Sequence, residues 1–465
     1  MRLLSLLPRI LAIFLIILPP LFAIRQPEMM QGSDFVMTFY PAGAMIASGQ
    51  AANIYPPPGA TSFIDAPFNL FAHKLLAHLP PLYVAIYMYP PLVAAVFVPF
   101  SMLPPPAAMV LWQALSVAVM GIVAYMFAAG SRKKAFDYFF MMALFCPVFH
   151  TLLIGHLGIV LGLLPLALGY LLLTQGKEMA AGYAWGFLAL KPQFLPAAML
   201  MAGALLLTKR PRVAIGLALG LVTFTGLSSL VLGPEIFLSW LHSFKMSDSI
   251  FANPAYGFPE YMAVSLPAVL MQCFSHDQRA LAKLPIYGLA AAVGLFTLWR
   301  CVRVLQASGA QGGDEWEKSK SRSRALSLIM TLGLLVLPLV LPHFVFYDLC
   351  GLSLICIITY QDYWNPAEGG IMRAVRRLMW WVCNIYYCSF MFLTVKPFKH
   401  WYAMVLVVFF AFLFYRVLGL CGKEPTTSKA LVEALPPVDN AELPPADKTD
   451  PPPADQADLP PESAS

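Results

Sequence analysis

Long apolar runs, separated by short polar stretches, fill the chain as far as about residue 420. Most of them approach the roughly 20 residues that a helix needs to cross the hydrocarbon core of a bilayer. We therefore predict an all-α, polytopic membrane protein with about twelve transmembrane helices. The predicted crossings are residues 7–24, 106–129, 136–154, 157–174, 179–190, 193–208, 213–232, 282–305, 326–341, 344–360, 378–395 and 400–420.

One further apolar stretch, Pro80 to Leu103, does not fit this scheme. A crossing there would reverse every later loop and move Arg132-Lys133-Lys134 to the other side of the membrane. We therefore predict one long external segment over 25–106, with interfacial helices and an apolar part that enters the membrane and returns. Tyr89-Pro90-Pro91 suits a break in such a re-entrant helix, because proline removes a donor and restricts the residue before it.

Lysine and arginine gather in the loops on one side of the predicted threading, as is typical of the cytoplasmic side. This excess places both termini in the cytoplasm. The loops that carry it are Arg132 to Lys134, Lys177, Lys209 to Arg212, Arg300 to Arg324, Arg373 to Arg377 and Arg416 to Lys423.

The composition excludes an ordinary soluble domain. Of 465 residues, 59% are hydrophobic and only 12% are charged, and the mean hydropathy is +0.70. The eight cysteines show no CxxC pair or zinc spacing, so neither a disulfide framework nor a zinc site is expected. The basic start and first apolar run could pass for a signal peptide. No small-x-small cleavage site precedes Arg25, however, and we predict an uncleaved first helix.

The last 43 residues, 423–465, differ from the rest. They contain ten prolines, nine acidic residues and three lysines, and Leu-Pro-Pro occurs three times. A segment of this composition cannot bury a core. We predict a transmembrane domain over 1–422 and a disordered, cytoplasmic tail rich in Pro, Ala and Asp over 423–465.

A few polar residues interrupt the apolar pattern, and the predicted threading puts them on one face of the membrane: Asp34, His156, Lys191, His343 and Asp348. Lys191 follows the short run Met179 to Leu190 and precedes Pro192. A lysine at this depth costs a few kcal/mol unless it is paired or hydrated. It is either a functional residue in a polar cavity or a lysine that snorkels from a helix end.

Several short motifs occur in order along this face. They are Asp34-Phe35-x-x-x-x-Tyr40, Asn53-Ile54-Tyr55, Tyr89-Pro90-Pro91-Leu92, Gly155-His156-Leu157-Gly158 and Ala189-Leu190-Lys191-Pro192. Together they resemble the polyprenol-phosphate-mannose-dependent mannosyltransferases of glycosyltransferase family 87, within the GT-C superfamily. The resemblance covers about residues 5–420. The family commonly carries Gly-Gln-x-Asn where this chain has Gly155 to Gly158, which weakens the match at the fourth position.

The resemblance implies an integral-membrane enzyme that moves a sugar, mannose in the family, from a polyprenyl-phosphate donor to a hydroxyl on the non-cytoplasmic face. Asp34 would be the general base. Lys191 and His343 would bind the donor phosphate, and Tyr40, Tyr89, His156 and Asp348 would line the substrate pocket. Such chemistry needs a carboxylate near the attacking hydroxyl and positive groups near the departing phosphate. The lipid-linked sugar is then a substrate, and neither a cofactor nor a metal is expected.

Each candidate also has a structural interpretation. Asp34 could be a helix N-cap, and Asp348 could simply pair with a neighbouring cation. His156 and His343 could be buried, hydrogen-bonded histidines. The tyrosines at 40, 55 and 89 could belong to an interfacial aromatic belt.

Other activities find less support in the sequence. No phosphate-binding loop, His-Glu-x-x-His motif or Asp-x-Asp in the first external segment occurs. A secondary transporter or lipid flippase is the main alternative, although no repeated pair of broken helices is found; an inactive scaffold is a third. The expected partners are the lipid-linked donor, a glycan or glycolipid acceptor and membrane lipids, not nucleic acid. The expected location is a cell membrane such as the bacterial inner membrane.

Overall fold

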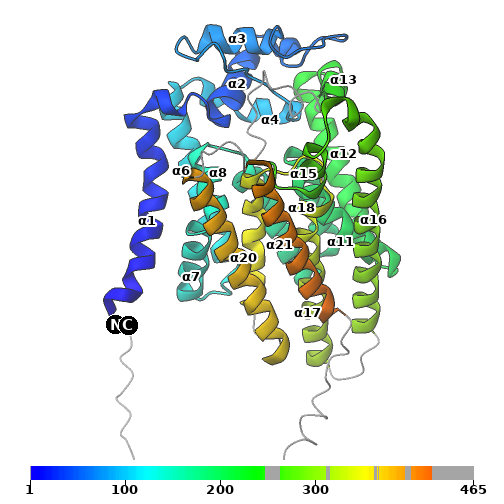
Figure 1. Cartoon of the computed structure of the whole chain (residues 1–465). Helices are drawn as coiled ribbons and strands as arrows, with labels where there is room; N and C mark the ends of the chain where they lie inside the picture. The colour runs from blue at the N-terminus through cyan, green and yellow to red at the C-terminus, as the bar shows by residue number, and fades with distance from the viewer. Residues whose placement is uncertain are drawn as a thin grey trace, which may run out of the picture. The chain divides into compact units, whose positions relative to one another are not determined.

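The structure is a computed structural model, and it describes residues 2–246, 262–309, 315–360, 364, 366–392 and 399–421. The regular secondary structure of these residues is helical and includes no β-strand; one isolated antiparallel bridge joins Ala263 to Val345. Met1–Gly422 forms one compact unit, whose helices run side by side in Figure 1. The predicted tail, 423–465, lies outside the described residues.

Six helical segments of the described chain are long and apolar enough to cross a membrane. They lie on α1 (Arg2–Arg25), α6 (Pro105–Phe127), α12 (Arg212–Leu232), α16 (His276–Gly309), α17 (Glu315–Leu335) with α18 (Leu337–Val340), and α21 (Lys399–Leu420). A seventh is formed if α7 (Arg132–Ala143) and α8 (Cys146–Leu153), bent by 71°, count as one span. The chain is thus a multi-pass membrane protein, while the finer count of twelve crossings stays a prediction.

Most of the other predicted crossings coincide with helices that are short or interrupted, whereas 378–395 begins within α20 (Pro366–Phe392), which has 27 residues. A π-helix, η4 (Gly158–Leu163), precedes α9 (Leu164–Thr174), and α10 (Glu178–Gly186) continues into η5 (Phe187–Leu190). Lys191 separates η5 from η6 (Pro192–Phe194) and α11 (Leu195–Leu207). The remaining helices are α13 (Pro234–Ser243), η7 (Phe244–Met246), α15 (Leu266–Gln272), η10 (Phe346–Leu352) and α19 (Ser353–Ile358).

Residues 26–104 contain only short helices, none of which is a candidate span. They are η1 (Pro27–Met30), η2 (Phe35–Phe39), α2 (Tyr40–Ala47), η3 (Ala51–Asn53), α3 (Pro67–Leu75), α4 (Pro91–Val96) and α5 (Val98–Ser101). In Figure 1, α2, α3 and α4 lie across one end of the long helices, which we call the α3 end. The stretch predicted to be re-entrant, Pro80 to Leu103, is therefore a loop followed by two short helices.

Aromatic side chains hold this layer together. Phe97 stacks on Phe39 at 5.1 Å between ring centroids and contacts Trp112 of α6 at 4.7 Å. Gly43 permits close approach, because a Cβ there would lie 2.4 Å from the Phe97 carbonyl oxygen. The layer is thus packed directly against a long helix, and it supplies a rigid support for the residues that precede α2.

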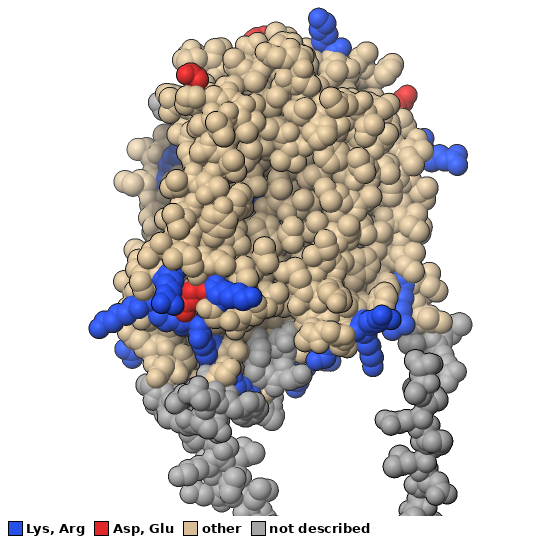
Figure 2. Space-filling view, turned by 180° about the vertical axis from the view of Figure 1, so that it is seen from behind, with Lys and Arg blue, Asp and Glu red and all other residues tan. Residues whose placement is uncertain are grey.

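Charge is distributed as expected for a membrane protein. Figure 2 shows a broad uncharged belt and, below it, a band of Lys and Arg side chains at the end opposite α3. We call this the basic end; the end of α16 and the start of α17 lie there in Figure 1. Apolar side chains of α1 such as Ile10 and Phe14 are 60% and 55% exposed, which suits contact with lipid.

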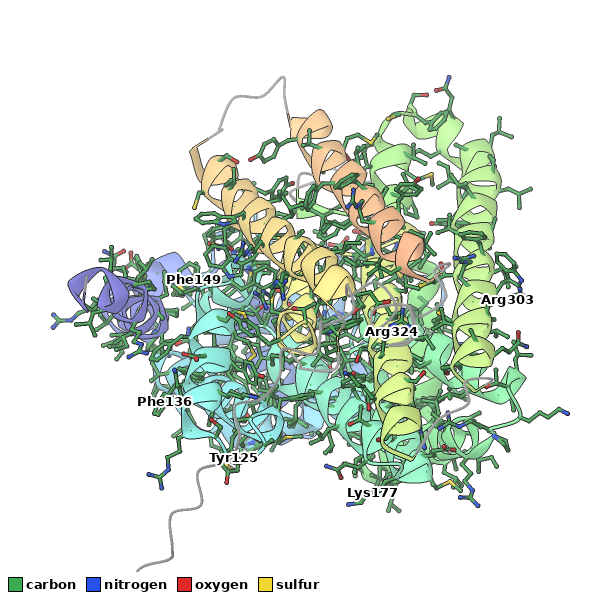
Figure 3. The ribbon with its side chains drawn as sticks, turned by 90° about the horizontal axis from the view of Figure 1, so that it is seen from below. Tyr125, Phe136, Phe149, Lys177, Arg303 and Arg324 are labelled. Carbon is green, nitrogen blue, oxygen red and sulfur yellow. The ribbon has the colours of Figure 1, made fainter. Side chains whose placement is uncertain are left out.

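Seen from below, α1 lies on one side of the unit and α16, with Arg303 on its outer face, lies on the opposite side (Figure 3). Arg324 of α17 is turned inward and forms an ion pair with Glu368 of α20. This pair ties two helices together near the basic end.

Candidate active site

The Asp34 backbone lies directly against the turn that carries His156. The Phe35 N–H donates a hydrogen bond to the Ile154 carbonyl at 3.1 Å. Gly155 adopts φ +65°, and a Cβ on it would lie 2.6 Å from the Phe35 Cβ. Only glycine fits both the left-handed backbone and this close approach without strain. Residues 120 positions apart in the chain are thereby fixed next to each other.

Asp34 precedes η2, but its side chain makes no capping hydrogen bond. Instead the Val36 N–H donates to the Ser33 hydroxyl at 3.4 Å. The N-cap interpretation of Asp34 therefore has no support in the side-chain geometry. Its carboxylate is left available for other contacts.

His156 is fully buried and stands at the centre of a cluster of polar side chains. Its Nε2 lies 2.8 Å from the Tyr89 hydroxyl, 3.3 Å from the Lys191 Nζ and 3.9 Å from the Asp34 Oδ2. Its Nδ1 accepts a hydrogen bond from the Gly158 N–H at 3.2 Å. A neutral ring therefore carries its proton on Nε2, the nitrogen that faces the other site residues.

Lys191 is fully buried and paired with Asp348. The Lys191 Nζ lies 2.6 Å from the Asp348 Oδ1, and neither side chain is exposed. The ammonium also lies 5.6 Å from the ring centroid of Tyr89 and 5.5 Å from that of Tyr347, distances typical of cation–π contacts. Lys191 thus does not snorkel, and Asp348 is the neighbouring anion that balances its charge.

The Asp34 side chain is 33% exposed, although its Oδ2 is buried and has no hydrogen-bond partner. Burial raises the pKa of Asp34 to about 6, against an ordinary value of 3.8. Lys191 lowers that pKa, Asp348 raises it, and the Tyr347 hydroxyl lowers it through a hydrogen bond. Asp34 is therefore an accessible carboxylate whose proton exchanges near neutral pH, which is the range that suits a general base.

Tyr347 is a site residue that the sequence analysis missed. Its ring centroid lies 4.1 Å from that of His156, and its carbonyl accepts a hydrogen bond from the Thr151 hydroxyl at 3.0 Å. No motif singles it out among 19 tyrosines. Its position directly before Asp348 is the one signal that could have drawn attention to it.

The structure brings together five of the predicted site residues, namely Asp34, Tyr89, His156, Lys191 and Asp348. Tyr40 is buried in the α3-end layer, and its hydroxyl donates to the Leu103 carbonyl at 2.9 Å. His343 is partly exposed in the loop between α18 and η10, and its role in donor binding stays a prediction.

Two π-helices adjoin the site. The segment η2 begins directly after Asp34, and η4 begins two residues after His156. Short π-helical turns are rare and occur often at functional sites. Among the described residues, no group of three or more His, Cys, Asp or Glu side chains is arranged to hold a metal ion.

Comparison with known proteins gives one result. The model of glycosyltransferase family 87 matches residues 87–338, more than half of the chain; this range contains Tyr89, His156 and Lys191 but not Asp34 or Asp348. Neither the curated proteins nor the solved structures contain a match. The family match agrees with the resemblance drawn from the motifs, and it implies a glycosyltransferase with a sugar donor and an acceptor. The chain belongs to glycosyltransferase family 87.

Proposed function

We propose that this membrane glycosyltransferase transfers a sugar, mannose by resemblance, from a polyprenyl-phosphate donor to an acceptor hydroxyl, with Asp34 as the general base. The observation that carries the proposal is the position of Asp34. The Asp34 side chain is partly exposed, whereas Asp348, the other carboxylate of the cluster, is fully buried. The Asp34 Oδ2 lies 3.9 Å from the His156 Nε2, and the buried Lys191 Nζ lies 3.3 Å from the same nitrogen.

In the proposed step, the acceptor hydroxyl gives its proton to Asp34 while its oxygen attacks the anomeric carbon of the donor. The bond from that carbon to the phosphate oxygen breaks, and the polyprenyl phosphate leaves with the bonding electrons. A pKa of about 6 leaves Asp34 mostly ionised at pH 7 yet basic enough to take the proton.

We assign Lys191 the role of the positive end of a fixed ion pair. Direct contact with a donor phosphate would require it to leave Asp348, and separation of a buried pair is costly. The ammonium lies 3.3 Å from the His156 Nε2 and acts on Asp34 more strongly than Asp348 does, so the pair, without separating, is oriented to stabilise negative charge on the leaving group. Tyr89 and Tyr347 hold the ammonium in place from two sides.

The finer topology belongs to the same proposal. We propose a GT-C-like arrangement of about twelve crossings in which 25–106 and the α3 end face the non-cytoplasmic side, and both termini lie in the cytoplasm. The band of Lys and Arg at the basic end supports this orientation (Figure 2). Membership in a glycosyltransferase family favours transfer over the transporter or flippase alternative.

The direct test is transfer of radiolabelled mannose from polyprenyl-phosphate-mannose into membrane extracts by wild type and Asp34→Asn. Loss of a positioned base typically costs about 10²–10⁴ in rate, so the variant should transfer at least about 100-fold more slowly. Asp65→Asn is the matched control, because Asp65 is an exposed acid in the same segment; it should retain wild-type activity. Equal activity of wild type and Asp34→Asn would remove Asp34 from the base role.

A further inference from the structure

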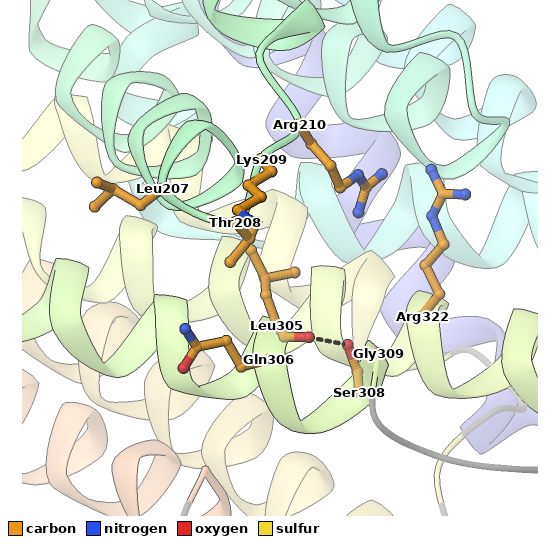
Figure 4. A pocket seen from close by; sticks show the side chains of 9 residues that line it. All are labelled: Leu207, Thr208, Lys209, Arg210, Leu305, Gln306, Ser308, Gly309 and Arg322. Carbon is orange, nitrogen blue, oxygen red and sulfur yellow. Dashed lines mark hydrogen bonds between the residues drawn. The ribbon is translucent and has the colours of Figure 1, made fainter.

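A cavity lies at the basic end, far along the chain from Asp34. It has a volume of about 520 Å³ and lies between the end of α11, the end of α16 and the start of α17 (Figure 4). Its lining is Leu207, Thr208, Lys209, Arg210, Leu305, Gln306, Ser308, Gly309 and Arg322. None of these residues contributes to the site described above.

Among the described residues, positive charge exceeds negative charge around this cavity. Arg210 and Arg322 both bind the same carboxylate oxygen, Glu178 Oε1, with Arg210 Nε at 3.1 Å and Arg322 at 3.3 Å. Lys209 has no carboxylate partner in the described part of the chain. Three described cations therefore share one described acid, and an anionic ligand would reduce this excess of positive charge.

The backbone of Lys209 is the second observation. Lys209 adopts φ +63°, and the Arg210 N–H donates to the Leu205 carbonyl at 2.9 Å, which closes α11 with a turn that normally carries glycine. A lysine is strained in this conformation, whereas glycine is not. Binding of a ligand by the Lys209 ammonium at the cavity would explain why a lysine occupies this position. A cation near a helix C-terminus is also stabilised by the helix dipole, so a test must separate these two effects.

The cavity also has an apolar side. Leu207 lines it and is 60% exposed, and its neighbour Leu206 is 49% exposed. Exposed leucines beside exposed cations are suited to contact with the acyl chains of a lipid that has a charged headgroup. A free phosphate would use only the cations, whereas a phospholipid would use both sides of the cavity.

We infer that this cavity binds the phosphate of an anionic phospholipid, with Lys209, Arg210 and Arg322 as its cations and Leu207 against the acyl chains. Basic pockets between membrane helices are suited to anionic headgroups. The lipid would join α11, α16 and α17 at the end opposite the proposed catalytic residues.

The test measures binding of phosphatidylglycerol to the full-length protein in neutral detergent, by native mass spectrometry and by the rise in melting temperature. Wild type should bind phosphatidylglycerol in preference to phosphatidylcholine. Lys209→Gly removes the cation but suits the turn, so it should fold at least as well while binding phosphatidylglycerol about fivefold more weakly, the loss expected for one cation near an anionic surface. Arg322→Gln should weaken binding to a similar degree.

Lys133→Gln is the matched control, since Lys133 is an exposed lysine in the first turn of α7, outside the cavity; its binding should equal that of wild type. The proposal is overturned if Lys209→Gly binds phosphatidylglycerol as wild type does, which would leave Lys209 with only its effect on the helix dipole. It is also overturned if inorganic phosphate at the same concentration raises the melting temperature as much as the lipid does, because the ligand would then be free phosphate.

Discussion

Two charged clusters in the described part of the chain differ in how their charges are balanced. In the cluster around His156, Lys191 and Asp348 are fully buried and face each other at 2.6 Å. In the cluster around Glu178, the side chains of Arg210 and Arg322 are 28% and 44% exposed, and the cations outnumber the acid. An unpaired charge lowers the stability of the folded protein strongly when it is buried, but only slightly when water screens it. The first cluster is therefore suited to fixed geometry and the second to exchange with a charged ligand.

The largest expected effect on stability comes from breaking the balance in the buried cluster. Lys191→Met leaves the Asp348 carboxylate buried without its partner, and we expect a loss of about 3–5 kcal/mol in the free energy of unfolding. The double variant Lys191→Met with Asp348→Leu removes both charges and should recover most of that loss. Thermal and denaturant unfolding in detergent measure the stability of both variants.

The same pair of variants separates structure from catalysis. If Lys191 supplies the field that stabilises the departing phosphate, the double variant should be folded yet strongly reduced in mannose transfer. Wild-type transfer by the folded double variant would mean that the ion pair serves stability alone.

The next largest effect concerns the turn that holds Asp34 in place. Gly155→Ala puts a methyl group 2.6 Å from the Phe35 Cβ on a left-handed backbone, and we expect a loss of about 1–3 kcal/mol together with reduced transfer. Gly121→Ala in α6 is the control, because nothing lies within 4 Å of a Cβ there. If Gly155→Ala is as stable and active as Gly121→Ala, the contact between residues 35 and 155 does not position the site.

The third effect is the pH dependence of transfer. Because the pKa of Asp34 is about 6, and the ionised form is the base, kcat/KM should fall about tenfold per pH unit below 6 and level off above it. The weak residual activity of Asp34→Asn should lack this dependence. A wild-type profile that is flat from pH 5 to pH 8 would contradict the assignment.

The contribution of Asp34 to the free energy of unfolding should decrease as the pH rises, whereas transfer increases. This difference separates loss of catalysis at low pH from acid unfolding. The folded-state pKa of Asp34 lies above its ordinary value of 3.8, so its contribution to stability is complete below pH 3.8 and is lost as the pH rises through about 6. The melting temperature of Asp34→Asn relative to wild type should therefore be higher at pH 8 than at pH 5.

The smallest effect is expected in the exposed cluster. Arg210→Gln leaves Glu178 paired with Arg322, and exposed ion pairs contribute about 0–1 kcal/mol. Without added anionic lipid, the free energy of unfolding should therefore change by less than about 1 kcal/mol. A loss comparable to that of Lys191→Met would show that exposure is not what distinguishes the two clusters.

The sequence predicted the helical segments well because apolar periodicity and length determine where a membrane helix can form. Each predicted crossing coincides with helix in the structure, including the bent α7 and α8. The number of complete crossings could not be obtained in this way. A short apolar helix such as α10 satisfies the same pattern whether it spans the bilayer or is enclosed by neighbouring helices.

The candidate site was predictable in part. Asp34, His156, Lys191 and Asp348 stood out because charge and polarity are rare in this chain, and the structure brings them together. Tyr347 did not stand out, because a tyrosine at an apolar interface is common. The ion pair between Lys191 and Asp348 joins two residues more than 150 positions apart in the chain, which no local pattern encodes.

The two π-helical turns have a consequence for how such a site can change over time. A π-turn has one residue more than the α-turn it replaces, so a single inserted or deleted codon is enough to create or erase it. If one residue were deleted from Phe35–Phe39, α2 could keep its helical hydrogen bonds. The residues before the deletion, including Asp34, would then be rotated by about 100° around the helix axis. Deletion of one residue would therefore be enough to move Asp34 away from the other side chains of the cluster, without substitution of any of them.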